Sequence, residues 1–213
     1  MKRQWSRRDV LRRSAAVGVV TAVPGSVLAQ AARGAPYANL TAAEAATLEA
    51  IVARLIPSDA NGPGALEAGA VRYIDGALGV PLAAHRSAYA AGLAAVDAYT
   101  RTTGGTSFAM LTPERQDQVL LDMEQNRATG FSPSAAVFFE LVLGHTLEGT
   151  FGDPHYGGNQ DFIGWELLGY PGLRLAVTAE QQGMNAALDP VQSSAYDHAM
   201  FETHTTQSER NDD

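Results

Sequence analysis

The chain has 213 residues, 46% of them hydrophobic, which suffices for one substantial core and predicts a single domain. Residues 1–29 carry six basic side chains and one acid, whereas the remainder carries nine arginines, no lysine and 22 acids, a surface that argues against nucleic acid as a partner. The absence of cysteine excludes disulfides, thiolate metal ligands, covalently attached c-type haem and cysteine-held iron–sulfur clusters.

The N-terminus has the three parts of an export signal. Arg7 and Arg8 form a twin-arginine pair, and the uncharged stretch 14–28, mostly Ala and Val, is too short to span a membrane. Small residues then predict cleavage after Ala29, with Ala31 as the alternative. We therefore expect residues 1–29 to be a twin-arginine signal peptide read by the Tat translocase, and residues 30–40 to be a linker; the alternative is an uncleaved basic arm. A periplasmic location follows from this signal.

The first two helices are predicted from caps and breakers. Thr41 and Glu44 form a capping box ahead of apolar residues at helical spacing, and this helix should end at Pro57. A second helix is expected over residues 65–78. The connection between them contains three polar residues that favour local turn hydrogen bonds over a cation site, namely Ser58, Asp59 and Asn61.

Further helices are predicted along the rest of the chain. One should begin at Pro81 and run to about residue 100, the next should follow the Thr112-Pro113 cap, and a third should follow Ser132-Pro133. A short helix is expected at Thr178, and no convincing alternating strand is present. The prediction is an all-α protein, with a single helical domain of about five to six helices over residues 41–190 and a polar, mobile tail over residues 191–213.

The segment from Gly149 to Gly172 fits neither a helical nor a strand period. Seven glycines alternate with large aromatic rings, so we expect a long Gly- and aromatic-rich loop with a functional role. The rings could turn inward as a small core, or face outward and anchor a partner protein. The residues predicted to bind a partner, Trp165 and Tyr170 foremost, are Phe151, Tyr156, Asn159, Trp165 and Tyr170.

Four potential metal ligands fall in the same part of the chain, namely His145, Glu148, Asp153 and His155. Their donor types would suit iron, manganese or zinc, but a dinuclear bundle site needs Glu-x-x-His elements on separate helices. A structural or interface role is therefore the preferred interpretation. The sequence contains no G-x-S-x-G elbow and no dinucleotide fingerprint, which favours an interaction module over an enzyme.

Three segments resemble the gluconate 2-dehydrogenase subunit 3 family. They are the twin-arginine leader, the Ile56-Pro57-Ser58-Asp59 turn leading to Gly64-Ala65 and Tyr73-Ile74-Asp75, and the stretch Gly149–Gly172 with Gly152-Asp153-Pro154, Gly157-Gly158-Asn159, Gly164-Trp165 and Gly169-Tyr170-Pro171-Gly172. The last segment is the most specific, and together the three span most of the chain.

The resemblance implies a helical, non-catalytic small subunit of an FAD-dependent sugar or sugar-acid dehydrogenase. Its partners would be a large FAD-containing subunit of the glucose-methanol-choline type and a multihaem cytochrome c, so FAD and c-type haem would lie on partner subunits and no cofactor on this chain. Membrane association would then come through those partners. The rival hypotheses are a free-standing periplasmic metal-binding protein or enzyme centred on the four candidate ligands, and a periplasmic sugar-binding module.

Overall fold

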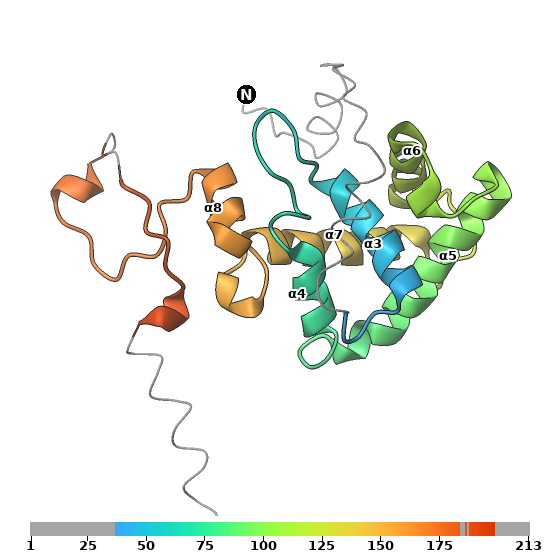
Figure 1. Ribbon diagram of the computed structural model, residues 1–213, viewed down its shortest axis with the longest axis horizontal. Coiled ribbons are helices and arrows are strands. Elements are labelled where there is room, and N and C mark those ends of the chain that lie inside the picture. Colours follow the sequence, from blue (N-terminus) through green and yellow to red (C-terminus); the bar gives the residue numbers. More distant parts are fainter. Residues whose placement is uncertain (1–36, 184–185, 187, 199–213) are drawn as a thin grey trace, which may run out of the picture. The chain divides into compact units, whose positions relative to one another are not determined.

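The computed structural model describes residues 37–183, 186 and 188–198 (Figure 1). Arg7, Arg8, Ala29 and the final residues of the predicted tail lie outside these described residues. Within them, regular structure is entirely helical, as predicted, with one isolated bridge between Asp59 and Gly62. The α-helices are α3 (Ala42–Leu55), α4 (Ala70–Ala77), α5 (Arg86–Gly104), α6 (Pro113–Glu124), α7 (Ala135–Phe151) and α8 (Ile163–Leu168).

The capping box predicted at the start of α3 is confirmed. The Glu44 amide donates to Thr41 Oγ1 at 3.3 Å, and the Thr41 amide donates to the Glu44 carboxylate at 2.8 Å. Arg86, the first residue of α5, also pairs with this carboxylate at 2.8 Å. Burial raises the pKa of Glu44, but the hydrogen bonds from Thr41 and Arg86 outweigh burial and lower the pKa overall. One acid therefore caps α3 and ties it to α5.

The second helix begins later than predicted. Residues 65–69 form turns, and α4 begins at Ala70 because Gly69 takes a left-handed conformation with φ of 78°. In the connection before it, the Asn61 amide donates to Asp59 Oδ1 at 2.7 Å, which confirms the predicted local turn.

Two other helix starts differ from the prediction. The helix predicted from Pro81 begins at Arg86, after a 3₁₀ turn, η1 (Ala83–His85), and continues to Gly104. The cap of α7 is Ser134, whose Oγ accepts from the Val137 amide at 3.3 Å, rather than Ser132. The predicted Thr112-Pro113 start of α6 is confirmed.

A buried carboxylate joins the start of the described chain to α4. Asp75 accepts hydrogen bonds from the backbone amides of Ala38, Asn39 and Leu40 at 2.9, 2.8 and 2.9 Å. Asn39 Nδ2 in turn donates a hydrogen bond to the backbone carbonyl of Asp75 at 2.7 Å. This residue belongs to the Tyr73-Ile74-Asp75 motif, and its role is to fix the chain entering α3.

The apolar core lies among helices α3 to α7, which Figure 1 shows grouped around α7. Its largest fully buried side chains include Tyr89, Phe108 and Leu48. Gly92 on α5 makes room for the Phe138 ring of α7, because a Cβ at Gly92 would lie 2.3 Å from that ring. We call residues 37–148 the helical core and residues 149–183, 186 and 188–198 the C-terminal region. Within the described residues, no helix is both long and apolar enough to cross a membrane.

Candidate partner interface

The C-terminal region begins with the last turn of α7, and it contains more helix than predicted. Two 3₁₀ turns, η3 (Pro154–Tyr156) and η4 (Gln160–Phe162), precede α8, so the expectation of one continuous loop from Gly149 to Gly172 is wrong in this respect. Asn159, Asp161 and Phe162 have positive φ angles of 43°, 54° and 60°. These positive φ angles interrupt the backbone immediately before α8, which itself has only six residues. A helical spacing of apolar residues is therefore not visible in the sequence, and α8 was not predicted.

The glycines of this segment allow one stretch of backbone to lie directly on another. A Cβ at Gly158 would lie 2.1 Å from the Gly149 carbonyl oxygen, and a Cβ at Gly164 would lie 1.8 Å from the Thr150 carbonyl oxygen. Gly149 itself faces α4, where a Cβ would lie 2.9 Å from Ala70 Cα. The segment therefore wraps around the last turn of α7, and its glycines serve close packing within the chain.

Asn159 is the hub of this wrapping. Its amide donates to the Gly149 carbonyl at 2.7 Å, its Nδ2 donates to the Gly152 carbonyl at 2.8 Å, and its Oδ1 accepts from the Gly164 amide at 2.8 Å. The Gly149 and Gly152 carbonyls at the end of α7 thus find donors outside the helix. Asn159 is 0% exposed, so in this conformation the predicted partner-binding residue serves the fold instead.

The aromatic residues divide between the two interpretations left open by the sequence. Trp165 is 8% exposed, and its Nε1 donates to the Phe151 carbonyl at 3.0 Å. The rings of Phe162 and Tyr170 pack on Trp165 with centroids 5.2 and 5.0 Å away. Trp165 is therefore the centre of a small core. Tyr170 is 42% exposed, and Phe151 is half-buried.

The four candidate metal ligands do not come together. Among the described residues, no group of three or more His, Asp or Glu side chains could hold a metal ion. His145 Nδ1 and the Tyr89 hydroxyl share a hydrogen bond of 2.9 Å, and Glu148 accepts from the Tyr73 hydroxyl at 2.8 Å. Asp153 and His155, as described below, bind a later part of the chain.

The polar groups at the junction of α4, α5 and α7 have shifted pKa values. Burial lowers the pKa of His145, the charge of Glu148 opposes this, and His85 adds to the lowering, so that the neutral imidazole is favoured. Burial, together with the hydrogen bond to Glu148, raises the pKa of Tyr73 to about 12. His85 packs its ring edge-on to His145, with centroids 5.5 Å apart. The arrangement is a hydrogen-bonded joint between the three helices.

A contact that the sequence analysis missed joins the chain near residue 195 to η3. Asp153 accepts from Ser194 Oγ at 2.6 Å and from the Ala195 amide at 2.8 Å. The Tyr196 hydroxyl lies 2.6 Å from that of Tyr156, and its ring stacks on His155 with centroids 3.8 Å apart. Burial raises the pKa of Asp153, but the hydrogen bonds from Ser194 and from the Ala195 and His155 amides lower it overall.

Residues 191–198 therefore do not follow the prediction of a mobile tail from residue 191. They are held against η3, and the Val191 amide donates to the Pro171 carbonyl at 3.0 Å. The signal that could have revealed this is the capping box of Ser194 and Asp197, which opens the 3₁₀ turn η6 (Ala195–Asp197). The short helix expected at Thr178 is reduced to a single 3₁₀ turn, η5 (Glu180–Gln182).

Exposed apolar side chains gather in and beside the C-terminal region. Of the twelve large apolar residues exposed among the described residues, eight lie between residues 147 and 196. They are Leu147, Tyr156, Leu167, Leu168, Tyr170, Leu175, Val177 and Tyr196. Single exposed apolar residues are normal, whereas contiguous apolar patches are typical of surfaces that bind another molecule.

Comparison with known proteins gives one match. The model of the family described as Gluconate 2-dehydrogenase subunit 3 matches residues 42–172, which begin at α3 and end just beyond α8. No curated protein and no solved structure matches the chain.

Proposed function

Because the chain belongs to the gluconate 2-dehydrogenase subunit 3 family, we propose that it is the small, non-catalytic subunit of an FAD-dependent sugar or sugar-acid dehydrogenase. The observation that carries this proposal is the extent of the match. It covers α3 to α7 and the whole wrapped segment around Asn159 and Trp165. The partner would be a large flavoprotein of the glucose-methanol-choline type.

The proposed role includes export. The pair Arg7 and Arg8, followed by an uncharged stretch and Ala29, is typical of a Tat signal peptide. The Tat pathway carries folded proteins, so one signal on this chain would serve a flavoprotein that has already bound FAD. The complex would then reside in the periplasm, or at the membrane through a further subunit.

The chemistry would belong to the partners. Substrate oxidation would pass a hydride to FAD on the large subunit, and electrons would pass to c-type haem on a cytochrome subunit. This chain has no cysteine with which to attach c-type haem. Its contribution would be to bind, stabilise and escort the flavoprotein.

The experiment that tests this proposal is co-expression with the flavoprotein, which we expect a neighbouring reading frame to encode without its own signal peptide. The intact chain should bring the flavoprotein and its FAD-dependent activity into the periplasmic fraction. Replacing Arg7 and Arg8 with lysines should leave both in the cytoplasm. Equal periplasmic activity without this chain would disprove the escort role.

A further inference from the structure

The strongest unassigned feature is the exposed surface of the C-terminal region, part of which lies beyond the family match. Leu168 on α8 is 62% exposed, and Tyr170, Leu175 and Val177 follow it on the next stretch of chain. Of these residues, Leu175 and Val177 lie outside residues 42–172. Three more exposed apolar side chains, Tyr156, Leu167 and Tyr196, also belong to the C-terminal region. Those of the helical core are Val80, Met110, Leu121, Val137 and Leu147.

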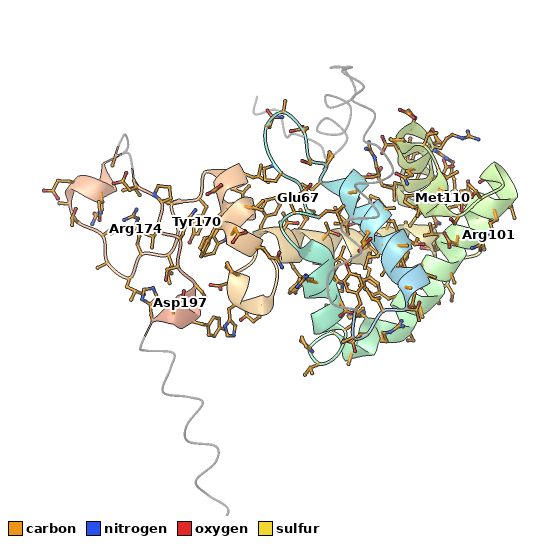
Figure 2. The ribbon with its side chains drawn as sticks, in the orientation of Figure 1. Glu67, Arg101, Met110, Tyr170, Arg174 and Asp197 are labelled. Atoms are coloured by element: carbon orange, nitrogen blue, oxygen red, sulfur yellow. The ribbon has the colours of Figure 1, made fainter. Side chains whose placement is uncertain are left out.

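The same region is strongly acidic. Between residues 149 and 198 there is one cation, Arg174, and its guanidinium donates to the Asp189 carbonyl. The carboxylates of this stretch are Asp153, Asp161, Glu166, Glu180, Asp189 and Asp197. All except Asp153 belong to exposed residues. Figure 2 labels Tyr170, Arg174 and Asp197 in this region and Met110 and Arg101 in the helical core.

The stretch beyond the family match is held in place by the wrapped segment. Gln192 Nε2 donates to the Glu166 carboxylate at 2.7 Å, and Ser194 and Tyr196 contact η3 as described. Gly172 allows the backbone of Val191 to approach, because a Cβ there would lie 2.0 Å from the Val191 carbonyl oxygen. A surface whose parts are already tied together loses less conformational entropy when a partner binds.

We propose that this acidic, apolar surface is where the flavoprotein binds, and that residues 173–183 and 188–198 extend it beyond the family domain. The complementary face of the flavoprotein would be apolar at its centre and lined with arginine or lysine at its rim. This inference rests on the proposed function. A second copy of the chain would bring carboxylates against carboxylates, and an anionic lipid surface would repel them, so neither fits as well.

The apolar part of the proposal is tested by the double variant Leu168→Ser/Leu175→Ser in the complex. We expect its affinity for the flavoprotein to fall by about tenfold or more, because each change removes apolar area from the interface. The matched control is Val80→Ser/Met110→Ser, since these side chains are 82% and 75% exposed on the helical core. The control should bind within about twofold of the unaltered chain.

The charge part is tested by neutralising three exposed acids with Asp161→Asn, Glu180→Gln and Asp189→Asn. Asparagine tolerates the left-handed backbone of Asp161, so the first change should not strain the chain. The matched control neutralises three acids of α6, with Glu114→Gln, Asp117→Asn and Glu124→Gln. We expect only the first set to slow association at low salt and to flatten the dependence of the rate constant on ionic strength.

The outcomes separate this inference from the proposed function. If the unaltered chain fails to bind the flavoprotein at all, the proposed function fails. If it binds, and the test and control sets behave alike in chains with unchanged circular dichroism, the surface lies elsewhere and the inference is overturned. Self-association that Leu168→Ser/Leu175→Ser abolishes, or sedimentation with phosphatidylglycerol vesicles, would also overturn it in favour of a second copy or a membrane.

Discussion

The helical core is held together by buried apolar side chains from five helices, whereas the C-terminal region is held mainly by hydrogen bonds and by backbone contacts at glycines. Apolar packing tolerates changes of shape, since neighbouring side chains can move into new positions. Close backbone contacts, and a hydrogen-bonding residue such as Asn159 that joins several backbone groups, tolerate few substitutions. The two regions should therefore respond to different kinds of substitution, and the C-terminal region should open first.

The largest expected effect is that of Gly164→Ala. The new Cβ would meet the Thr150 carbonyl oxygen at 1.8 Å, so the backbone around Asn159 and Trp165 must separate from α7. We expect a local loss of about 3 kcal/mol or more, at the upper end for overpacking. Hydrogen exchange measured by mass spectrometry should rise across residues 149–198 and stay unchanged in α3. Equal loss of protection in α3 would show that the two regions unfold as one unit.

Asp75→Ala should affect the helical core instead. It leaves the amides of Ala38, Asn39 and Leu40 without their acceptor, which should lower the free energy of unfolding by about 2–3 kcal/mol. Urea denaturation measures this change. Asp117→Ala is the control, because it removes an exposed ion pair with Arg54 and should cost at most about 1 kcal/mol. Similar losses for both variants would contradict the role assigned to Asp75.

Between pH 7 and pH 5 the joint at His145 should weaken. Its folded pKa lies below the unfolded value of 6.5, so the unfolded chain takes up the proton first and stability falls as the pH drops below 6.5. The slope from this residue is at most about 1.4 kcal/mol per pH unit. Denaturation at several pH values should show the slope, and His145→Gln should remove it. The lowered carboxylates, such as Glu44 and Asp153, lose their contribution only at lower pH, as the pH falls through their folded pKa values.

The smallest expected effects are those of two glycines on one helix, α7. A Cβ at Gly144 of α7 meets nothing within 4 Å, so Gly144→Ala should raise the free energy of unfolding by about 0.5–1 kcal/mol through helix propensity. Gly149→Ala, on the same helix, should lower it, because Ala70 and Tyr73 occupy the space. Thermal unfolding of the two variants should therefore shift in opposite directions. A stabilising Gly149→Ala would show that the contact between α4 and α7 can relax.

Much of the helical core could be predicted from sequence because its signals are local. The Thr41 and Glu44 capping box and the Thr112-Pro113 start depend only on neighbouring residues. The errors came where a residue's conformation depends on the fold. Gly69 adopts its left-handed φ beside the side chain of Gln160, a residue distant from it in the sequence. As a result, α4 starts five residues later than its sequence pattern predicts.

The candidate site could be located from sequence, but the sequence could not show which of its side chains are buried and which are exposed. Composition marked residues 149–172 as unusual, yet the direction of the Trp165 ring depends on the Phe151 carbonyl, and the burial of Asn159 depends on the end of α7. Tyr170 and Leu168, in the same segment, are exposed. Sequence spacing also placed the four candidate ligands near one another, whereas hydrogen bonds to Tyr89, Tyr73 and Ser194 draw three of them apart.

The backbone contacts at Gly158 and Gly164 have a genetic consequence. An added methyl group at either position meets a carbonyl oxygen, and no substitution elsewhere can make a carbonyl smaller. Gly92 differs, because an added methyl group there meets the Phe138 ring, which a smaller side chain could replace. A selection for restored function should thus recover second-site suppressors of Gly92→Ala at position 138, and only true revertants of Gly158→Ala and Gly164→Ala.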